Sequence, residues 1–317
     1  MRSVFLAFAL VATAASCAAD PVTTPGSGGT TGKGGTTSTG GRSGNGGSTG
    51  NGGTTSTGGS SQPPASVDCQ DTSAFSVSIT QQYGSTPITV DGNSNKTYYM
   101  IANWWGTPYN NQSESLSGLG FTMSNPNNVV TSVKDNPMGF PSIFIGSYSG
   151  KNTKGSNLPK QVSELTSVPT VFSTNSDQKG TANYNATYDV WMTQSNALVS
   201  GSSPGAGGAY LMVWLFKPTD RQPRGTIQAN GHVVNGVSGS WDVWFDPSPK
   251  DNIPCVSYVS NKVLSSLEFD LNNFIQDAVN SDNGVTSSQY LSIIFAGFEV
   301  WGGGDGLQIK RFCANVK

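Results

Sequence analysis

Short apolar or alternating runs recur along the chain from about residue 67 to its end, and turns rich in Gly, Asn, Pro and Ser separate them. Side chains along a strand point alternately to two faces, so each run can bury one face at least. Many short strands with such turns are typical of an antiparallel sandwich or jelly roll. The runs are FSVSITQQY, KTYYMIANWW, GFTMS, PSIFIGSY, YNATYDVWM, AYLMVWLF, GTIQAN, GSWDVWF, CVSYVS, YLSIIFAGFEVW and LQIKRFCANV.

One late stretch has helical instead of strand periodicity. Ser265 and Glu268 have the spacing of a capping box, which marks a helix N-terminus. We therefore expect one α-helix that begins near Ser265, in an otherwise all-β domain. Its apolar face would consist of residues at helical spacing: Leu267, Leu271, Phe274, Ile275 and Ala278.

The first 66 residues are not expected to contribute to this core. Residues 1–19 combine Arg2 with an apolar run and small residues, the pattern of a secretory signal peptide, and the run is too short to span a bilayer. Residues 20–66 are dominated by Gly, Ser and Thr and contain the octet GGTTSTGG twice, which predicts a disordered linker. The folded domain is predicted to cover residues 67–317.

The signal peptide predicts a secreted or surface-tethered protein. Cys17 follows AAS and would be the lipidated cysteine of a bacterial lipoprotein, although Ala14 stands where Leu is usual; cleavage near Ala19 is the alternative, and both stay open. An exported domain is expected to pair two of Cys69, Cys255 and Cys313 and to leave one thiol over. The sequence allows all three pairings.

Composition argues against several classes of function. A net charge of -2 with 11% charged residues gives no electrostatic reason to expect nucleic acid or an anionic membrane surface as partner. His232 is the only histidine and no CxxC spacing occurs, so neither a metal site, a Ser-His-Asp triad nor a cofactor is expected. The 7 Trp and 10 Tyr suit a protein that stacks aromatic rings on sugars, and we expect a monomer.

Of the four glutamates, Glu299 stands out. It lies in the apolar run IIFAGFEVWGG, where a buried carboxylate is costly without a purpose. We interpret it as functional; the alternative is a buried ion pair. Glu114 and Glu164 lie in polar contexts that indicate solvated surface, and Glu268 has the capping role given above.

Three further groups of residues share faces of predicted strands. Asp189 lies on the same face as Thr187 and Trp191, either as a functional carboxyl or as an aspartate that bonds to nearby backbone. Asn103 and Trp105 in IANWWG are a common sugar-contact pair, for which a core Trp is the alternative. The third group, in the run AYLMVWLF, forms a face that suits a groove: Tyr210, Met212 and Trp214.

These motifs, in their order along residues 68–317, resemble glycoside hydrolase family 12, a family of β-jelly-roll endo-β-1,4-glucanases and xyloglucanases. The resemblance rests on KTYYMIANWWG, NATYDVWM, AYLMVWLF, PRGTI, GSWDVWFDP, SYVSNKVLSSLEFDLNNFI and QYLSIIFAGFEVW. It implies a β-1,4-glucan as partner: cellulose, xyloglucan or mixed-linkage glucan. It also implies retaining hydrolysis, which needs two carboxyl groups about 5–5.5 Å apart.

The resemblance assigns roles residue by residue. The family's acid/base Glu, in a strand that reads roughly FGTEPF, falls on Glu299. Its Asp in AYDLF, which orients the nucleophile, falls on Asp189. Its remaining glucan-contacting positions, in NLWG and after the nucleophile, fall on Asn103, Trp105, Met212 and Trp214, and Trp191 shares the face of Asp189.

The nucleophile position itself departs from the family. The Glu of ELMIWL is replaced by Tyr210 in YLMVWL, and Met212 and Trp214 fix the alignment. Three outcomes stay open: a weak hydrolase, an inverting hydrolase that uses Asp189 and Glu299, or a non-catalytic glucan-binding protein. In the last case Tyr210 would stack on a sugar or bond to Asp189. Because losing a covalent nucleophile forfeits the division of one difficult step into two easier ones, we favour weak or absent hydrolysis.

Overall fold

The computed structural model describes residues 20–21, 67, 69, 76–90, 95–106, 112–124, 136–175, 183–247 and 253–317. The predicted signal peptide with Cys17, and residues 22–66 of the predicted linker, lie outside the described residues. No helix in the described part of the chain is long and apolar enough to cross a membrane.

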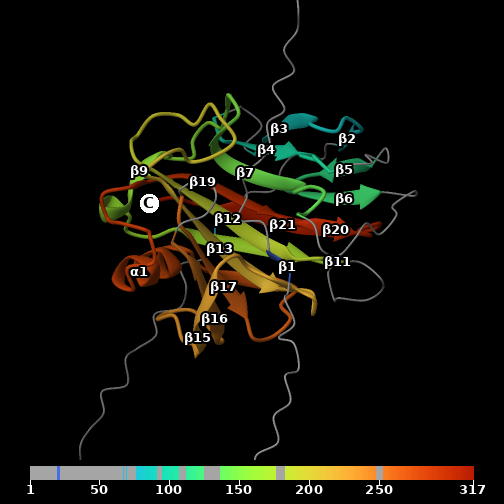
Figure 1. Ribbon diagram of the computed structural model, residues 1–317. Helices are drawn as coiled ribbons and strands as arrows, with labels where there is room; N and C mark the ends of the chain where they lie inside the picture. Colours follow the sequence, from blue (N-terminus) through green and yellow to red (C-terminus); the bar gives the residue numbers. More distant parts are fainter. Residues whose placement is uncertain are drawn as a thin grey trace, which may run out of the picture. The chain divides into compact units, whose positions relative to one another are not determined.

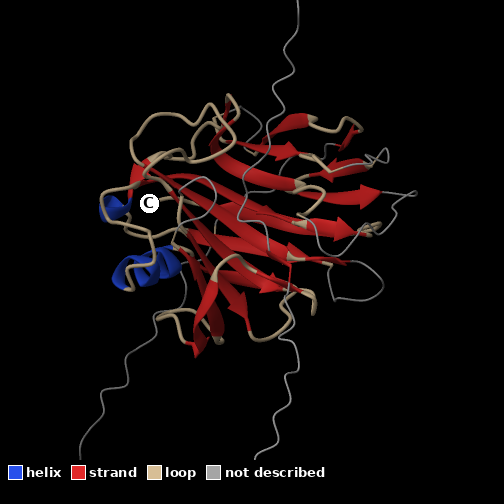
Figure 2. Cartoon of the chain, viewed as in Figure 1, coloured by secondary structure: helices blue, strands red, loops and turns tan. Residues whose placement is uncertain are grey.

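Two main β-sheets make up the described domain, and the helix lies at one end of them (Figures 1 and 2). In spatial order the larger sheet contains β15 (Thr226–His232), β16 (Trp241–Asp246), β17 (Cys255–Ser260), β13 (Ala209–Phe216), β12 (Ala186–Thr193), β19 (Tyr290–Gly297), β7 (Ser142–Tyr148), β4 (Thr97–Ile101) and β3 (Ser85–Thr89), with β8 (Lys151–Asn152) paired to β7 and β9 (Lys160–Gln161) paired to β19.

The smaller sheet contains β18 (Ser266–Asp270), β10 (Pro169–Thr174), β21 (Gln308–Ala314), β6 (Gly120–Ser124), β5 (Ser113–Ser117) and β2 (Ser76–Ile79). Two short pairs join β1 (Asp20–Pro21) to β14 (Arg221–Gln222) and β11 (Asn183–Tyr184) to β20 (Val300–Gly302). The predicted jelly-roll sandwich is therefore confirmed, and each of the eleven predicted runs contains a strand.

One pair departs from the predicted antiparallel pattern. Strands β13 and β17 run parallel, with Met212 opposite Ser257. Parallel neighbours need a long crossover between them, and residues 217–254, which contain β14 to β16, supply it.

The predicted helix exists, but its predicted start is wrong. Helix α1 covers Asn272–Asn280, and Phe274, Ile275 and Ala278 form its buried face as expected. Leu267 and Glu268 instead belong to β18, where Leu267 is opposite Phe172 of β10. The pairing with β10 buries Leu267 in a sheet, so the apparent capping box of Ser265 and Glu268 does not form. The N-cap residue of α1 is Leu271, without a side-chain capping bond, and the preceding Asp270 accepts a hydrogen bond at Oδ1 from the Asn272 main-chain N–H at 3.0 Å.

The main hydrophobic core lies between the two sheets. Alternate residues of β12, namely Tyr188, Val190 and Met192, face this core and are fully buried. Aromatic side chains from both sheets meet edge to face there; the Tyr188 ring centroid lies 5.4 Å from that of Phe172 and 5.4 Å from that of Phe269. This packing leaves the other face of the larger sheet for the remaining residues of β12 and β13.

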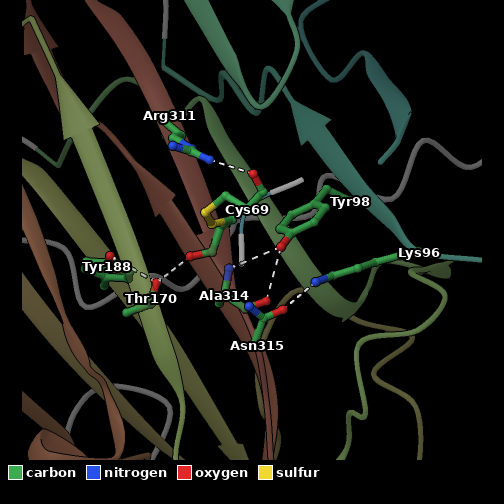
Figure 3. The surroundings of a disulfide bond; sticks show 9 residues. Cys69, Lys96, Tyr98, Thr170, Tyr188, Arg311, Ala314 and Asn315 are labelled. Carbon is green, nitrogen blue, oxygen red and sulfur yellow. Dashed lines mark hydrogen bonds between the residues drawn. A yellow bond between two sulfur atoms is a disulfide. The ribbon is translucent and has the colours of Figure 1, made fainter. Parts of the chain in front are cut away.

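A disulfide joins Cys69, before the first strand of the domain, to Cys313 in β21, which is one of the three predicted pairings (Figure 3). Arg311 donates a hydrogen bond to the Cys69 carbonyl at 2.6 Å, and the Thr170 hydroxyl donates one to the Cys313 carbonyl at 2.8 Å. Cys255, the third of these cysteines, is fully buried on β17, where its Sγ lies 3.6 Å from Ser257 Oγ.

Candidate functional site

Strands β12 and β13 place the predicted site residues on the face of the larger sheet that points away from the main core. Asp189 of β12 is opposite Met212 of β13, and Trp191 is opposite Tyr210. Both pairs belong to one face, as the alternation of side chains predicts. A second apolar cluster, which we call the outer-face cluster, covers this face: Ile101, Phe140, Phe144, Tyr148, Trp191, Val199, Tyr210, Met212, Trp214, Ile253, Cys255, Val259, Ile293, Phe295 and Trp301.

Aromatic rings surround Asp189. The Trp191 ring lies 5.6 Å from the Tyr210 ring and 5.5 Å from the Tyr148 ring, edge to face in both cases. The Trp191 indole N–H donates a hydrogen bond to Asp189 Oδ2 at 3.0 Å. The predicted residues of β12 and β13 are thus brought together, and Asp189 is held by a side chain. The alternative of an aspartate that bonds to nearby backbone does not describe this contact.

The environment of Asp189 changes its acidity. Its side chain is only 2% exposed, and no hydrogen-bond partner for its Oδ1 exists among the described residues. Burial raises the pKa of Asp189 to about 7, against the smaller opposing effect of the Trp191 hydrogen bond. Burial likewise raises the pKa of Tyr148 to about 12, and the charge of Asp189 adds to that increase. Asp189 is therefore a carboxyl that titrates near neutral pH.

Glu299 follows β19 and is fully buried. Asn185, just before β12, holds it at three points. The main-chain N–H of Asn185 donates to the Glu299 main-chain carbonyl at 3.0 Å, and the main-chain N–H of Glu299 donates to Asn185 Oδ1 at 3.0 Å. The Asn185 side-chain Nδ2 donates to Glu299 Oε2 at 2.5 Å. Asn185 was not predicted from the sequence, where an Asn beside the start of a strand carries no specific signal.

The strand register separates the candidate catalytic positions along β12. Glu299 is bonded to Asn185, which precedes β12. Asp189 is four residues beyond Asn185 along the strand. Trp191, whose partner on β13 is Tyr210, is two residues beyond Asp189. Asp189 is therefore closer in register to Glu299 than Tyr210 is.

The side chains predicted to line a groove are buried in this structure. Tyr210, Met212 and Trp214 are each 0% exposed. The segment 194–208, between β12 and β13, covers part of this face, because its Val199 belongs to the outer-face cluster. The Val199 carbonyl also accepts a hydrogen bond from the Ser147 hydroxyl of β7 at 3.0 Å. A sugar therefore cannot stack on Tyr210 in this conformation, contrary to one role predicted for it.

Asn103 and Trp105 follow β4 and lie at the border of the outer-face cluster. Asn103 has a φ of 50°, and a hydrogen bond with its side chain lowers the pKa of the buried Tyr148 against the larger effect of burial. Trp105 packs against the cluster but is only partly buried, as are Tyr99 and Trp244. The predicted pair thus shares the face of Asp189, and Trp105 keeps surface that a ligand can reach.

A buried cation that lies against Trp301 was missed by the sequence analysis. Arg221 of β14 is fully buried, and its guanidinium carbon lies 5.2 Å from the centre of the Trp301 ring. Trp301 is two residues beyond Glu299. Arg221 lies in a polar turn, KPTDRQP, where neither burial nor a stacking partner is indicated by the sequence.

The other three glutamates divide differently from the prediction. Glu164 is exposed, as predicted, and Glu268 is exposed on β18. Glu114 is fully buried, so its prediction as solvated surface is wrong. Its Oε1 accepts a hydrogen bond from the Trp104 indole N–H at 2.7 Å. Burial raises the pKa of Glu114 to about 7, against the opposing effect of that bond. Among the described residues no group of His, Cys, Asp and Glu could hold a metal ion.

A family model for glycosyl hydrolase family 12 matches residues 96–317, which is most of the chain. The chain belongs to this family. Known family 12 proteins share the fold: endoglucanase Cel12A from Rhodothermus marinus superposes with a TM-score of 0.63 at 28% identity, over 76% of this chain and 99% of the other.

Two curated relatives have similar levels of identity. One is a probable cellulase, Cel12b, from Mycobacterium tuberculosis (strain ATCC 25618 / H37Rv), which is 27% identical over 162 residues, or 51% of this chain and 99% of the relative. The other is endoglucanase S from Pectobacterium parmentieri, 27% identical over 237 residues, or 70% of this chain and 83% of the relative. The family membership and the sandwich fold predicted from the sequence are thus confirmed.

Proposed function

We propose that this family 12 protein binds β-1,4-glucan at the outer face of the larger sheet and hydrolyses it weakly or not at all. The observation that carries this proposal is the state of Tyr210. It occupies the position that the family resemblance gives to the nucleophile, and it is fully buried against Trp191. A retaining mechanism needs a carboxylate there, about 5–5.5 Å from the acid/base.

Glucan binding needs less than hydrolysis does. Two partly buried aromatic rings, Trp105 and Trp244, lie at the border of the outer-face cluster. Asn103 is two residues before Trp105 in the chain. Rings of this kind stack on sugars, and an amide can bond to hydroxyl groups. The names of the relatives, a cellulase and an endoglucanase, support a β-1,4-glucan as the ligand, and the sequence resemblance adds xyloglucan and mixed-linkage glucan.

A second candidate is an inverting hydrolase, and Asp189 favours it. Its carboxyl is nearer in register to Glu299 than Tyr210 is, one of its oxygens has no protein partner among the described residues, and its pKa of about 7 suits a base near neutral pH. An inverting pair requires about 6.5–9.5 Å between the two carboxyl groups, with room for a water molecule.

We also propose that the protein acts outside the cell, as a secreted monomer or one anchored at the surface through Cys17. The support is the signal-peptide pattern of residues 1–19 and the Gly/Ser/Thr-rich segment that follows. Mass spectrometry of the mature N-terminus tests this: a diacylglyceryl group on Cys17 supports anchoring, and cleavage near Ala19 supports secretion.

The function is tested with the mature chain on carboxymethyl-cellulose, xyloglucan and mixed-linkage glucan. Affinity electrophoresis measures binding, and release of reducing ends measures hydrolysis, each for the wild type and for Glu299→Gln. We expect retardation on at least one glucan and little Glu299-dependent release. Vigorous release that Glu299→Gln abolishes would overturn the proposal, and NMR of the first anomer formed would then decide between retention and inversion. Failure to bind any glucan would favour a purely structural surface protein.

A further inference from the structure

We propose that Glu114 is a positioning residue for the candidate site, and that it acts through the indole of Trp104. The proposal rests on the glucan-binding function proposed above. No role at the site was predicted for Glu114, and its side chain touches none of the site residues in the described contacts.

The contact joins the two sheets of the sandwich. Glu114 lies on β5 of the smaller sheet and points into the main core, whereas Trp104 follows β4 of the larger sheet. Both side chains are at most 1% exposed, and the indole N–H donates to Glu114 Oε1 at 2.7 Å. A hydrogen bond to a buried carboxyl oxygen is directional, so it fixes both the orientation of the Trp104 ring and its position in the core.

Trp104 lies between two residues of the candidate site. Asn103 and Trp105, its neighbours in the chain, belong to the opposite face, where Trp105 packs on the outer-face cluster. The Trp104 ring also lies close to Gly139: a Cβ added there would stand 2.4 Å from Trp104 Cε3. The ring is therefore held from one side by Glu114 and from another by a backbone that has no room for a side chain.

Backbone bonds continue from this point to Glu299. Trp104 forms a bridge with Gly139, and Gly139 forms a bridge with Val300, the residue after Glu299. The Val300 N–H donates to the Gly139 carbonyl at 3.1 Å, and the Met138 N–H donates to the Val300 carbonyl at 2.7 Å.

The same segment holds the glucan-contact pair. The Trp105 N–H donates to the Met138 carbonyl at 2.8 Å, and the Phe140 N–H donates to the Asn103 carbonyl at 3.0 Å. One small backbone network thus carries both the contact residues and the acid/base candidate, and the Trp104 ring is its anchor in the core.

Packing alone does not account for a carboxyl at this place. Ile79 and Met123 are the residues opposite Glu114 on the two neighbouring strands, so an apolar side chain would suit the surroundings. A buried carboxyl costs free energy that an apolar residue would not. What it supplies instead is an acceptor for the indole N–H, and therefore a single orientation of Trp104.

Two variants of the full chain separate the acceptor from the volume. Glu114→Met keeps a long side chain without an acceptor, and Glu114→Gln keeps a carbonyl oxygen that can accept the same bond. Glu164→Gln, at an exposed glutamate, is the matched control. The readouts are affinity for xyloglucan and amide hydrogen exchange of peptides covering residues 102–106, 136–141 and 298–302, with α1 as an internal reference.

We expect Glu114→Met to weaken xyloglucan affinity by about tenfold, which corresponds to about 1.4 kcal/mol. In Glu114→Met, exchange should become faster in the three segments but not in α1, whereas Glu114→Gln and Glu164→Gln should show no acceleration and no loss of affinity. Wild-type exchange and affinity in Glu114→Met would overturn the proposal. If Glu114→Met does not fold, Trp104→Phe takes its place, because it removes the indole N–H donor and keeps an aromatic ring. Wild-type exchange rates in Trp104→Phe would then overturn the proposal. A wild type that binds no glucan refutes the proposed function, while the exchange measurements still decide the positioning role.

Discussion

The buried carboxyls predict that stability falls as pH rises from the acid range to neutrality. Burial raises the pKa of Glu114 from 4.5 to about 7. A carboxyl whose pKa is raised in the folded state binds its proton more tightly there than in the unfolded state. The contribution of this carboxyl to the unfolding free energy is therefore largest below pH 4.5. It decreases as the pH rises toward 7 and stays constant above pH 7.

The size of this effect follows from the shift. A difference of about 2.5 pKa units corresponds to about 3 kcal/mol of unfolding free energy lost between pH 4.5 and 7. Asp189 acts in the same direction, since its pKa is raised from 3.8 to about 7. Glu114→Gln keeps a neutral acceptor at all pH values. The variant should equal the wild type near pH 4.5 and exceed it by about 3 kcal/mol at pH 8.

Urea unfolding at several pH values from 4.5 to 8, with the disulfide intact, measures this difference. Glu164→Gln is the control, because that carboxyl is exposed and its removal should leave the pH dependence unchanged. A Glu114→Gln variant whose stability falls with pH as steeply as that of the wild type would refute the reasoning, because Glu114 would then be charged at no cost in the folded state.

Three further predictions concern other parts of the molecule. Tyr210→Glu should create or raise Glu299-dependent release of reducing ends if Tyr210 occupies the nucleophile position; Tyr210→Phe should not, and a folded but inactive Tyr210→Glu would count against that assignment. Cys69→Ser opens a disulfide between residues 244 apart and should lower the unfolding free energy by about 4–5 kcal/mol, measured by urea unfolding; an unchanged midpoint would contradict this. Asp277 accepts hydrogen bonds from Tyr258 at 2.7 Å and from the His232 ring at 2.9 Å, so Asp277→Ala should cost about 1–3 kcal/mol in thermal or urea unfolding, with Asp277→Asn losing less.

The sequence predicted most strands of the larger sheet because strand patterns are local, whereas β5, β10 and β18 of the smaller sheet were not among the predicted runs. All eleven runs became strands, and the bounds of β13 and β17 were predicted without error. Prediction failed where a distant partner decided the outcome. Leu267 has helical spacing to Phe274, but pairing with β10 makes it part of a strand. Glu114 lies among serines that are more exposed, and its burial depends on Trp104, which reaches it from the other sheet.

The contrast between local strand patterns and distant contacts also explains which residues of the candidate site were predicted and which were missed. Asp189, Trp191 and Tyr210 could be placed on one face by alternation, since they lie on long strands. Asn185 and Arg221 lie at strand ends, where the chain leaves the regular pattern, and only the folded structure brings them beside Glu299 and Trp301.

A tyrosine at position 210 is compatible with the fold for a physical reason. A nucleophilic carboxylate in the outer-face cluster would need to be charged, and burial opposes charge there, as the raised pKa of Asp189 shows. A phenol fills the position without that cost and gains an edge-to-face contact with Trp191 at 5.6 Å. On the proposed assignment of Tyr210 to the nucleophile position, loss of the carboxylate would favour burial of this face, and burial would keep substrate from Asp189 and Glu299. If so, Tyr210→Glu should also loosen the cover formed by residues 194–208, which faster amide exchange in that segment would reveal; exchange as slow as in the wild type would mean that the cover is held independently of Tyr210.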